Sequence, residues 1–423
     1  MKVLLISQGS TGDIYPLIAL GKALQKANHS VAYATAPLYK EEIEKAGIKY
    51  QYAPPDWEKP VFVDCMRALD RQPNPIALLK QIYRSGLSFM GELIDTIEDL
   101  IQENDLVVCS YIFPHFKVLC DRHKVAFATI TFCHSVIPAK DVTPDLVPKL
   151  QGFPTSIQYL WNSFWWRLIN KVVDQSINSI SGPTFKSRQI PPIKNFISAP
   201  ADLSIVCVSK SLMQQSRFLE SRFAYTGYLR WQSDTNDALE EELIQFCEDD
   251  AVPIITFGSV SFDNIQDIMS RFEKNWPKGQ KIILQSGWAG LSIQINRAEI
   301  KIIDQVSHDQ LFKYAACVIH HGGAGTTASV LHAGIPHVVV PHLGDQGFWA
   351  KEIVRLLNEA GLQYEFDPSF NPKRAPIIIP KDGYKGLKMA VDVSKSSTKP
   401  TENVVCRCEK VTEQEIVTAL RRN

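Results

Sequence analysis

Short apolar runs and longer amphipathic segments alternate along this chain. Apolar runs of strand length that are bounded by turn residues are typical of buried β-strands. In the first half they are residues 3–6, 30–35, 49–53, 106–110, 127–132 and 203–208, and in the second half residues 253–257, 281–285, 301–304, 317–320 and 337–341. Residues 16–27 and 38–46 have the spacing of amphipathic helices. The pattern therefore predicts an α/β protein.

Strand–helix alternation also predicts the topology, because it implies right-handed crossovers and parallel sheets covered on both faces. A chain of 423 residues exceeds a single ordinary core, and the alternation occurs twice. We expect two tandem Rossmann-like, doubly wound domains that face each other across a cleft. The N-terminal domain is predicted at residues 1–227, a polar linker at 228–242, the C-terminal domain at 243–393, and a tail with a helix that crosses back to the N-terminal domain at 394–423.

Residues 152–173 depart from this alternation because they are dense in aromatic side chains, including Phe153, Trp161 and Trp165. A helix that packs on the domain core explains this density most simply. A wall of an apolar acceptor pocket, or a patch that contacts membrane lipid, is the open alternative.

Composition narrows the classes of function. Lys plus Arg and Asp plus Glu both number 45, so the chain lacks the basic excess that a nucleic-acid binder needs. Nine cysteines, an odd number, do not indicate a disulfide framework, and Cys406 and Cys408 lack the paired spacing of a zinc site. The apolar run at 3–6 is too short for a signal peptide, and no run has the length of a membrane span. We expect a cytoplasmic enzyme, with peripheral contact at the inner face of a membrane as the alternative.

The most informative segment is HHGGAGTT at residues 320–327, between a predicted strand and a predicted helix. Glycines let the backbone approach a ligand closely, and the unpaired N–H groups of a helix start favour an anion. Two threonine hydroxyls and a histidine add further donors. The segment therefore predicts a pyrophosphate site built without a P-loop lysine.

Two further groups lie near this segment in the predicted fold. His320 and His321 are adjacent in a strand, so their side chains point to opposite faces and do not chelate one metal ion. We expect one of them to contact phosphate and the other to be structural. Asp345 and Gln346 follow the next strand, and a carboxylate beside an amide suits the vicinal hydroxyls of a sugar.

A second, weaker glycine-rich turn, GSTGD at residues 9–13, follows the first strand. It is not the dinucleotide fingerprint of a Rossmann fold, but open α/β sheets bind ligands at the edge where such turns lie. Asp13 has two interpretations, a helix N-cap and a carboxylate that faces a ligand held between the domains. The position of Asp13 alone favours the cap, whereas the presence of the glycine-rich segment at 320–327 in the other domain favours the carboxylate that faces a ligand.

These motifs resemble those of a known family. GGAGTT at 322–327, AGIP at 333–336, Pro341 and DQ at 345–346 are similar to the nucleotide-sugar signature of family 1 glycosyltransferases with the GT-B fold. GSTGDIYPL at 9–17 resembles the acceptor-side motif of the same enzymes. GDQGFWA at 344–350 and SGW at 286–288 resemble the sterol glucosyltransferases in particular, a branch shared with the bacterial glycosyltransferases of antibiotic aglycones.

The resemblance implies an inverting transfer of a hexose, with glucose expected, from a UDP-sugar to a hydroxyl of a hydrophobic acceptor such as a sterol, polyketide or terpenoid. The UDP-sugar is a co-substrate, and neither a cofactor nor a metal is expected. Asp13 is implied as the general base, without the second aspartate that plant members place where Ser110 stands here. The implied donor-binding residues are Ser10, Gly12, Gly258, Ser259, Trp288, Gln305, Val306, His320, Gly322, Gly323, Gly325, Thr326, Asp345 and Gln346, and the acceptor-pocket candidates are His134, Phe153, Trp161 and Trp165.

Some features depart from the family pattern or stay open. Gly347 stands where relatives carry proline, the segment 373–386 matches nothing, and the acceptor half at 56–198 is the least matched. The acceptor, the sugar, UDP against dTDP and the oligomeric state are therefore not decided. A nucleotide-sugar epimerase of the same fold and a non-catalytic nucleotide-sugar-binding protein are the alternatives. The aromatic run disfavours the epimerase, and Asp13 disfavours a pure binding protein.

Overall fold

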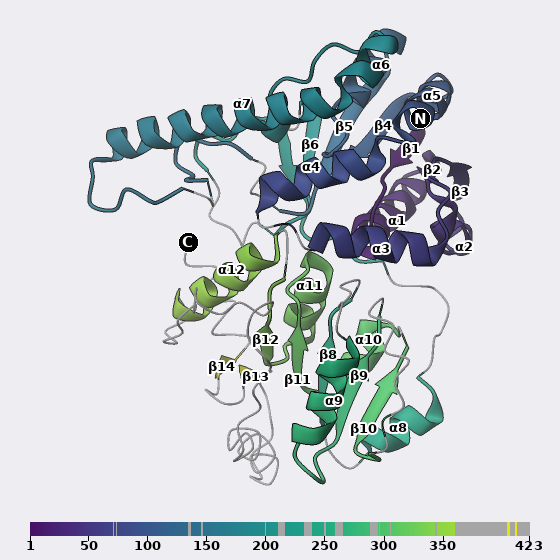
Figure 1. Cartoon of the computed structure of the whole chain (residues 1–423), viewed down its shortest axis with the longest axis vertical. Helices are drawn as coiled ribbons and strands as arrows, with labels where there is room; N and C mark the ends of the chain where they lie inside the picture. The colour runs from purple at the N-terminus through teal and green to yellow at the C-terminus, as the bar shows by residue number, and fades with distance from the viewer. Residues whose placement is uncertain are drawn as a thin grey trace. The chain divides into compact units, whose positions relative to one another are not determined.

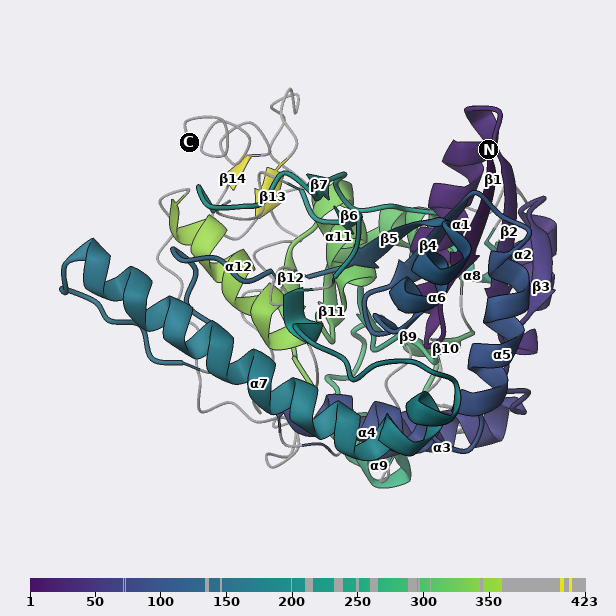
Figure 2. The same cartoon turned by 90° about the horizontal axis from the view of Figure 1, so that it is seen from above.

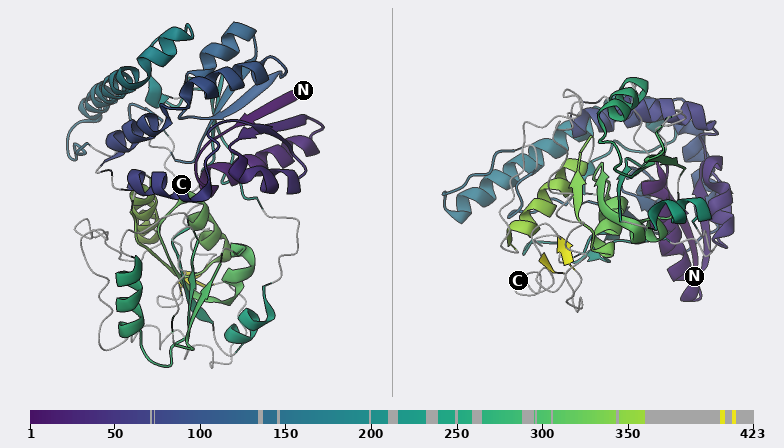
Figure 3. Two further views of the ribbon diagram at one scale, coloured as in Figure 1. Left: turned by 45° about the vertical axis from the view of Figure 1, so that its right-hand side comes forward. Right: turned by 90° about the horizontal axis from the view of Figure 1, so that it is seen from below.

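The computed structural model describes residues 1–70, 72, 74–133, 137–144, 147–198, 200–209, 216–231, 239–248, 251–258, 265–287, 295, 297–304, 306–342, 345–359, 404–406 and 411–412. The chain divides into two compact units, Met1–Asp234 and Thr235–Asn423, and the division falls inside the stretch expected to be a linker. Each unit contains a parallel β-sheet with helices packed against it (Figures 1 and 3). Both units therefore have the predicted α/β architecture.

The sheet of unit 1 has the strand order β3-β2-β1-β4-β5-β6-β7, with every neighbouring pair parallel. Leu4 and Val107 lie side by side in register, and both are fully buried, as expected of a sheet covered on both faces. The order reverses between β1 and β4, so their carboxyl ends form the switch point at which doubly wound sheets bind ligands. The strands are β1 (Lys2–Ile6), β2 (Ser30–Thr35), β3 (Lys49–Tyr52), β4 (Leu106–Ser110), β5 (Ala126–Thr131), β6 (Leu203–Val206) and β7 (Phe223–Tyr225).

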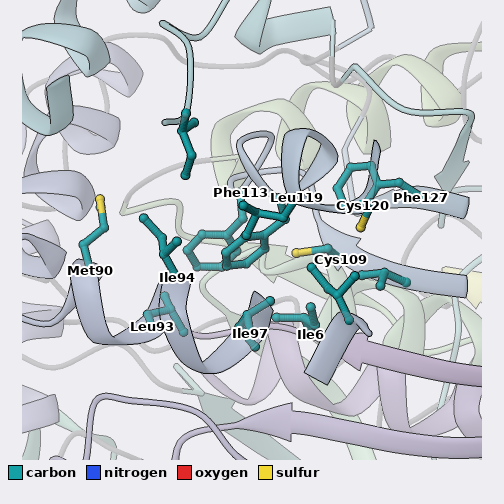
Figure 4. Close-up of a cluster of buried hydrophobic side chains, with 14 of the residues drawn as sticks. Ile6, Met90, Leu93, Ile94, Ile97, Cys109, Phe113, Leu119, Cys120 and Phe127 are labelled. Carbon is teal, nitrogen blue, oxygen red and sulfur yellow. The ribbon is translucent and has the colours of Figure 1, made fainter. Parts of the chain in front are cut away.

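Helices cover this sheet and build one apolar core with it. Residues of α5, α6 and α7 meet those of β1 and β4 in a buried cluster that includes Ile6, Ile97 and Phe113 (Figure 4). Burial of each such side chain stabilises the fold by about 1.5–3 kcal/mol. The helices are α1 (Thr11–Lys26), α2 (Lys40–Lys45), α3 (Lys59–Asp70), α4 (Pro75–Gly86), α5 (Met90–Ile101), α6 (Phe116–His123) and α7 (Thr155–Ser187), with 3-10 helices η1 (Pro37–Tyr39) and η2 (Phe196–Ser198).

The aromatic region forms the start of α7, a helix of 33 residues. One side of α7 is buried on unit 1 through Asn162, Trp166, Val173 and Ile177. The prediction of a helix packed on the domain core is therefore confirmed, although the helix continues beyond the region that suggested it.

The sheet of unit 2 has the order β10-β9-β8-β11-β12, again all parallel, and its switch point lies between β8 and β11. Two apolar clusters of its described residues contain Ile254 and Leu284 respectively. The strands are β8 (Val252–Thr256), β9 (Ile282–Gln285), β10 (Ile300–Ile303), β11 (Ala315–His320) and β12 (His337–Val339), and a separate pair is β13 (Val404–Cys406) and β14 (Val411–Thr412). The helices are α8 (Glu241–Cys247), α9 (Ile265–Asn275), α10 (His308–Leu311), η3 (Phe312–Tyr314), α11 (Ala324–Ala333) and α12 (Gln346–Glu359).

Every strand predicted from the apolar runs is present, with ends that differ by at most about two residues. β7 was not predicted, because three partly buried residues carry too little pattern. α1 begins at Thr11 instead of the expected Pro16, which lies inside the helix. The reason is local: the turn at Ser10 and Asp13 already starts the helix.

Candidate functional site

The switch point of unit 2 brings two loops and a histidine ring into contact. Gly258, after β8, has a φ of +56°, and a Cβ there would lie 2.9 Å from Cε1 of His321. Gly287, after β9, has a φ of +48°, and its Cβ would lie 2.1 Å from the carbonyl oxygen of Gly258. Both positions therefore require glycine, for the backbone conformation and for the space.

The turn from β11 into α11 has the geometry of an anion site. Gly322 has a φ of +85°, and its Cβ would lie 2.6 Å from Cγ1 of Val339. Gly323 is the N-cap of α11, and no described side chain caps that helix. The first N–H groups of α11 and the positive end of its dipole are therefore placed to bind an anion.

The first turn of α11 also contains Gly325 and two buried threonines. Thr326 and Thr327 are 7% and 1% exposed, and the N–H of Thr327 donates to the carbonyl oxygen of Gly323 at 2.9 Å. Oγ1 of Thr327 has no hydrogen-bond partner within the described ranges. Since an unpaired buried hydroxyl costs about 1–3 kcal/mol, the helix start keeps polar capacity that the described residues do not use.

His320 lies on the inner side of this turn, and its ring contacts other protein groups. Its Nδ1 accepts the N–H of Gly322 at 3.1 Å, and its Nε2 lies 2.9 Å from Nδ1 of His337, with the two rings stacked. The side chain is fully buried, and burial lowers its pKa well below the ordinary histidine value, with the charge effect of His337 in the same direction. The expected phosphate contact of His320 therefore does not fit, because both ring nitrogens already have protein partners.

The sequence did not decide which of the two histidines contacts phosphate, and the structure favours His321. Its ring lies against Gly258 and also against Gly323, where a Cβ would come within 2.3 Å of Nε2. Nδ1 of His321 is buried and has no hydrogen-bond partner in the described structure. Burial lowers the pKa of His321 to about 4, and nearby His342 and His308 act in the same direction. The ring is therefore neutral at pH 7 and offers a hydrogen bond rather than a positive charge.

Asp345 and Gln346 stand at the start of α12. The indole N–H of Trp349 donates to Oδ2 of Asp345 at 2.9 Å. Burial raises the pKa of Asp345, although the Trp349 hydrogen bond opposes that effect. Gln346 is buried, and its Oε1 accepts the backbone N–H of His342 at 2.7 Å. Both side chains are thus held in fixed orientations, as a sugar-binding pair requires.

A small network fixes the loop after β10. The side chain of Gln285, at the end of β9, donates through Nε2 to the carbonyl oxygen of Val306 at 3.0 Å. Oε1 of the same side chain accepts the hydroxyl of Thr256 at 2.9 Å. The backbone at Val306 is therefore tied to the sheet. Of the other expected donor residues, Ser259, Trp288 and Gln305 lie outside the described residues.

The turn after β1 in unit 1 closes on itself. Oδ2 of Asp13 accepts the backbone N–H of Ser10 at 2.8 Å and the Ser10 hydroxyl at 3.1 Å. Gly9 has a φ of +138°, and a Cβ there would lie 2.3 Å from Oδ2 of Asp13. Asp13 is therefore part of the capping box of α1, but the N-cap residue is Ser10 and not Asp13, because the helix begins earlier than its sequence position suggested. The expected donor contact of Ser10 does not fit this arrangement, because both of its donors are directed to Asp13.

Buried hydroxyl groups hold this turn in place through hydrogen bonds. The hydroxyl of Tyr39 donates to the carbonyl oxygen of Gly9 at 3.0 Å. Ser7 and Tyr33 lie 2.7 Å apart through their hydroxyls, and Tyr33 also donates to the carbonyl oxygen of Ile14. Burial raises the pKa of Tyr33 and Tyr39, and the charge of Asp13 acts in the same direction. Because these phenols stay protonated, they hold the turn as hydrogen-bond donors.

Comparisons with known proteins agree with this geometry. A UDP-sugar-dependent glycosyltransferase of Dictyostelium discoideum is 28% identical over 84% of this chain and 23% of its own length. A sterol 3-beta-glucosyltransferase of Arabidopsis thaliana is 24% identical over 84% of this chain and 56% of its own length. The crystal structure of the glycosyltransferase VinC in complex with DTDP superposes with a TM-score of 0.58 at 13% identity, covering 100% of both chains. The chain therefore spans less than two thirds of the length of the Dictyostelium and Arabidopsis relatives.

Two family models match separate parts of the chain. The model described as Glycosyltransferase family 28 N-terminal domain matches residues 3–95. The model described as Erythromycin biosynthesis protein CIII-like, C-terminal domain matches residues 290–374. In sequence and in fold the chain is similar to the family 1 glycosyltransferases of the GT-B fold. The first match covers the turn with Asp13, and the second covers the turn with His321 and the start of α12.

Three of the residues expected to contact an acceptor lie at or just before the start of α7. Phe153 is 53% exposed. The indole N–H of Trp161 donates to the carbonyl oxygen of Pro148 at 3.1 Å, and the rings of Trp161 and Trp165 are 5.5 Å apart. Their contact with an acceptor stays a prediction, and His134 lies outside the described residues.

The described part of the chain contains no cluster of His, Cys, Asp and Glu side chains that would hold a metal ion. Among the helices that the structure describes, none is long and apolar enough to span a membrane. The cysteines Cys65, Cys109, Cys120, Cys133, Cys207, Cys247 and Cys317 are free thiols.

Sequence reasoning missed the supporting residues of both turns. The stacked partner His337 comes from the next strand, and Tyr33 and Tyr39 come from β2 and η1. Nothing in the local sequence connects these residues to the turns. The signal that could have favoured His321 was the glycine at 258, because a glycine after the neighbouring strand leaves room for a ring.

Proposed function

We propose that this glycosyltransferase moves a hexose, with glucose as the first candidate, from a UDP-sugar to a hydroxyl of a hydrophobic alcohol. The observation that carries the proposal is the uncapped start of α11 beside the neutral, buried ring of His321. That combination suits a diphosphate, because backbone N–H groups and a fixed donor bind negative charge without a lysine. It also suits a diphosphate leaving group, whose departure requires charge stabilisation rather than a general acid.

In this proposal the donor lies across the switch point of unit 2. The N–H groups at Gly325 and Thr326 and the ring of His321 bind the diphosphate, while Gly258 and Gly323 leave room for that ring and Gly322 for Val339. Asp345 and Gln346 bind the sugar hydroxyls, and the loop at Val306 contacts the base. Support for the sugar role comes from the fixed side chains of Asp345 and Gln346, each held by a partner within 3 Å.

The acceptor hydroxyl requires a base, and Asp13 is proposed for that role. The acceptor oxygen attacks the anomeric carbon as the bond from that carbon to the diphosphate oxygen breaks. UDP leaves with the electron pair, and the hydroxyl proton passes to Asp13, so that an α-linked donor gives a β-glycoside. The capping bonds of Asp13 are compatible with this role, because a carboxylate offers about four lone-pair sites and can accept from an acceptor hydroxyl while it accepts from Ser10.

We further propose that the reaction needs no metal ion. The dipole of α11 and the donors around it supply the positive potential that Mg²⁺ supplies elsewhere. Turnover in the presence of a chelator should equal turnover with added Mg²⁺. A strict requirement for a divalent cation would contradict this assignment.

The experiment that tests the function is a product screen. The purified chain is incubated with UDP-glucose, UDP-galactose or dTDP-glucose and a panel of sterols, polyketides and terpenoid alcohols, and products are identified by mass spectrometry. A mass increase of one hexose on an acceptor supports the proposal, and the donor series ranks the nucleotide and the sugar. An epimerised nucleotide sugar as the only product, or tight donor binding with no transfer across the panel, would contradict it.

Location belongs to the same set of proposals. The protein is proposed to act in the cytoplasm, with peripheral contact at the inner face of a membrane where lipophilic alcohols accumulate. Support for membrane contact comes from one helix face of unit 1, which is described next.

A further inference from the structure

Helix α7 has two apolar sides, and only one of them is buried. The side that contains Trp166, Val173 and Ile177 packs on unit 1. The other side carries a stripe of exposed apolar residues at helical spacing. They are Phe153 (53% exposed), Ile157 (44%), Leu160 (72%), Phe164 (55%), Leu168 (36%) and Val172 (37%). Single exposed apolar residues are ordinary, but a continuous stripe on one helix marks an interaction surface.

The exposed charged residues of α7 beside this stripe are basic. Arg167 and Lys171 lie on the same exposed side of α7, and Lys149 is exposed just before the helix. The one acidic residue between positions 149 and 186 is Asp174. Its carboxylate accepts the backbone N–H groups of Asn195 and Phe196 at 2.7 and 2.9 Å, so it is directed to the protein and not to the stripe.

The arrangement of unit 1 makes this surface accessible. The N-terminal part of α7 extends away from the sheet of its own unit, as Figures 1 and 2 show. Trp161 and Trp165 lie beside the stripe, partly exposed, and aromatic rings of this kind prefer the boundary between lipid and water. A long helix with an apolar stripe, flanking cations and aromatic rings has the features of a helix that lies in a membrane interface.

We propose that the exposed face of α7 docks this protein on the surface of an anionic lipid bilayer. The apolar stripe enters the boundary between headgroups and acyl chains, and Arg167 and Lys171 contact the anionic headgroups. The charge pattern favours this occupant over a second copy of the chain, because two copies of the same face would bring like charges together. The inference does not depend on the transfer reaction, since binding to lipid is measured without any substrate.

The test is sedimentation of the whole chain with vesicles of phosphatidylcholine, alone or mixed with phosphatidylglycerol. We expect binding to the mixed vesicles, weaker binding to phosphatidylcholine, and loss of binding at high salt. The double variant Arg167→Gln with Lys171→Gln should bind the mixed vesicles roughly 30-fold more weakly, since each basic residue near an anionic surface contributes about 1 kcal/mol. Leu160→Gln with Phe164→Gln should reduce binding to both vesicle types by at least about tenfold.

Matched controls remove similar side chains elsewhere. Lys274→Gln with Lys278→Gln removes two exposed charges from unit 2, and Val61→Gln with Leu87→Gln removes two exposed apolar side chains from unit 1. Both controls should bind vesicles as the native chain does, and thermal unfolding checks that all variants fold. The proposal is overturned if the native chain does not bind mixed vesicles, or if the α7 variants bind as the controls do. A dimer in solution that the Leu160 and Phe164 substitutions dissociate, without vesicle binding by the native chain, assigns the face to a second copy instead.

Discussion

Replacement of Asp13 by asparagine separates its two proposed roles. Asparagine has nearly the same shape and keeps one carbonyl oxygen, which can accept the N–H and the hydroxyl of Ser10 as Oδ2 does now. It cannot accept a proton from an acceptor hydroxyl. The capping arrangement should therefore survive in Asp13→Asn, while the base is lost.

The structure sets the size of both effects. Full loss of a capping side chain costs about 0.5–2 kcal/mol of stability, but Asp13→Asn loses mainly the favourable charge at the start of α1, about 0.3–1 kcal/mol. Loss of a general base costs about 10²- to 10⁴-fold in rate. We therefore expect a small change in melting temperature and a fall in kcat of at least about a hundredfold, with donor affinity unchanged.

The assay measures initial rates by mass spectrometry on an acceptor found in the product screen, and donor affinity by calorimetry. Asp13→Ala is the matched control, because it removes both the base and the capping acceptor and should lose more stability at a similar residual rate. If Asp13→Asn turns over at the native rate, Asp13 is only a capping residue of α1. If unfolding of part of the Asp13→Asn sample accounts for the whole fall in its rate, the base role is also refuted.

Three other results follow from the described contacts. His321→Ala should weaken UDP binding by about tenfold to a hundredfold, because a hydrogen bond to a charged group contributes that much to the affinity. His320→Ala should instead mainly lower the melting temperature. If calorimetry gives His321→Ala and the native chain the same affinity for UDP, the phosphate role of His321 is contradicted. Because burial raises the pKa of Asp345, its carboxylate takes up a proton at a higher pH than an ordinary aspartate as the pH falls. On acidification, the affinity of the native chain for UDP-glucose should then decrease more than its affinity for UDP. In Asp345→Asn the two affinities should decrease by the same factor. If they already decrease by the same factor in the native chain, Asp345 does not bind the sugar. In α1, Gly21→Ala should lower the free energy of unfolding by about 1–3 kcal/mol, since its Cβ would lie 2.7 Å from Cδ1 of the buried Ile48. A denaturant titration in which Gly21→Ala is as stable as the native chain would refute the packing argument.

The strands were predictable because parallel strands buried on both faces are nearly continuous apolar runs. Leu4 and Val107 are examples, with no exposed surface in either. The helices α3, α4 and α5 lie between the predicted strands at 49–53 and 106–110 and were not predicted, although their sequences carry apolar residues at helical spacing. β7 is too short for any pattern.

The glycine-rich turn at 320–327 was predictable as a type of site, but the role of each histidine was not. Adjacent residues of a strand point to opposite faces, so one histidine had to face the interior. Which one does so depends on His337 from β12 and on the space left by Gly258 after β8. Both neighbours are distant in sequence, so local spacing carries no information about them.

The two glycine-rich turns both lie at the switch point of their own sheet, one after β1 and the other after β11, and they differ in one physical respect. In unit 1 the start of α1 carries the carboxylate of Asp13, which accepts the N–H of its own N-cap residue. In unit 2 the start of α11 has glycine as N-cap and no acidic residue in its first turn. A helix start that already holds a carboxylate repels a second anion, whereas an uncapped start favours one. The diphosphate should therefore bind at α11 and not at α1, which leaves the turn with Asp13 for the neutral substrate, the alcohol. A sulfate or UDP titration followed by NMR of the backbone amides should shift the signals of the α11 turn and leave those of the α1 turn in place, and the reverse pattern would exchange the assignment of the two turns.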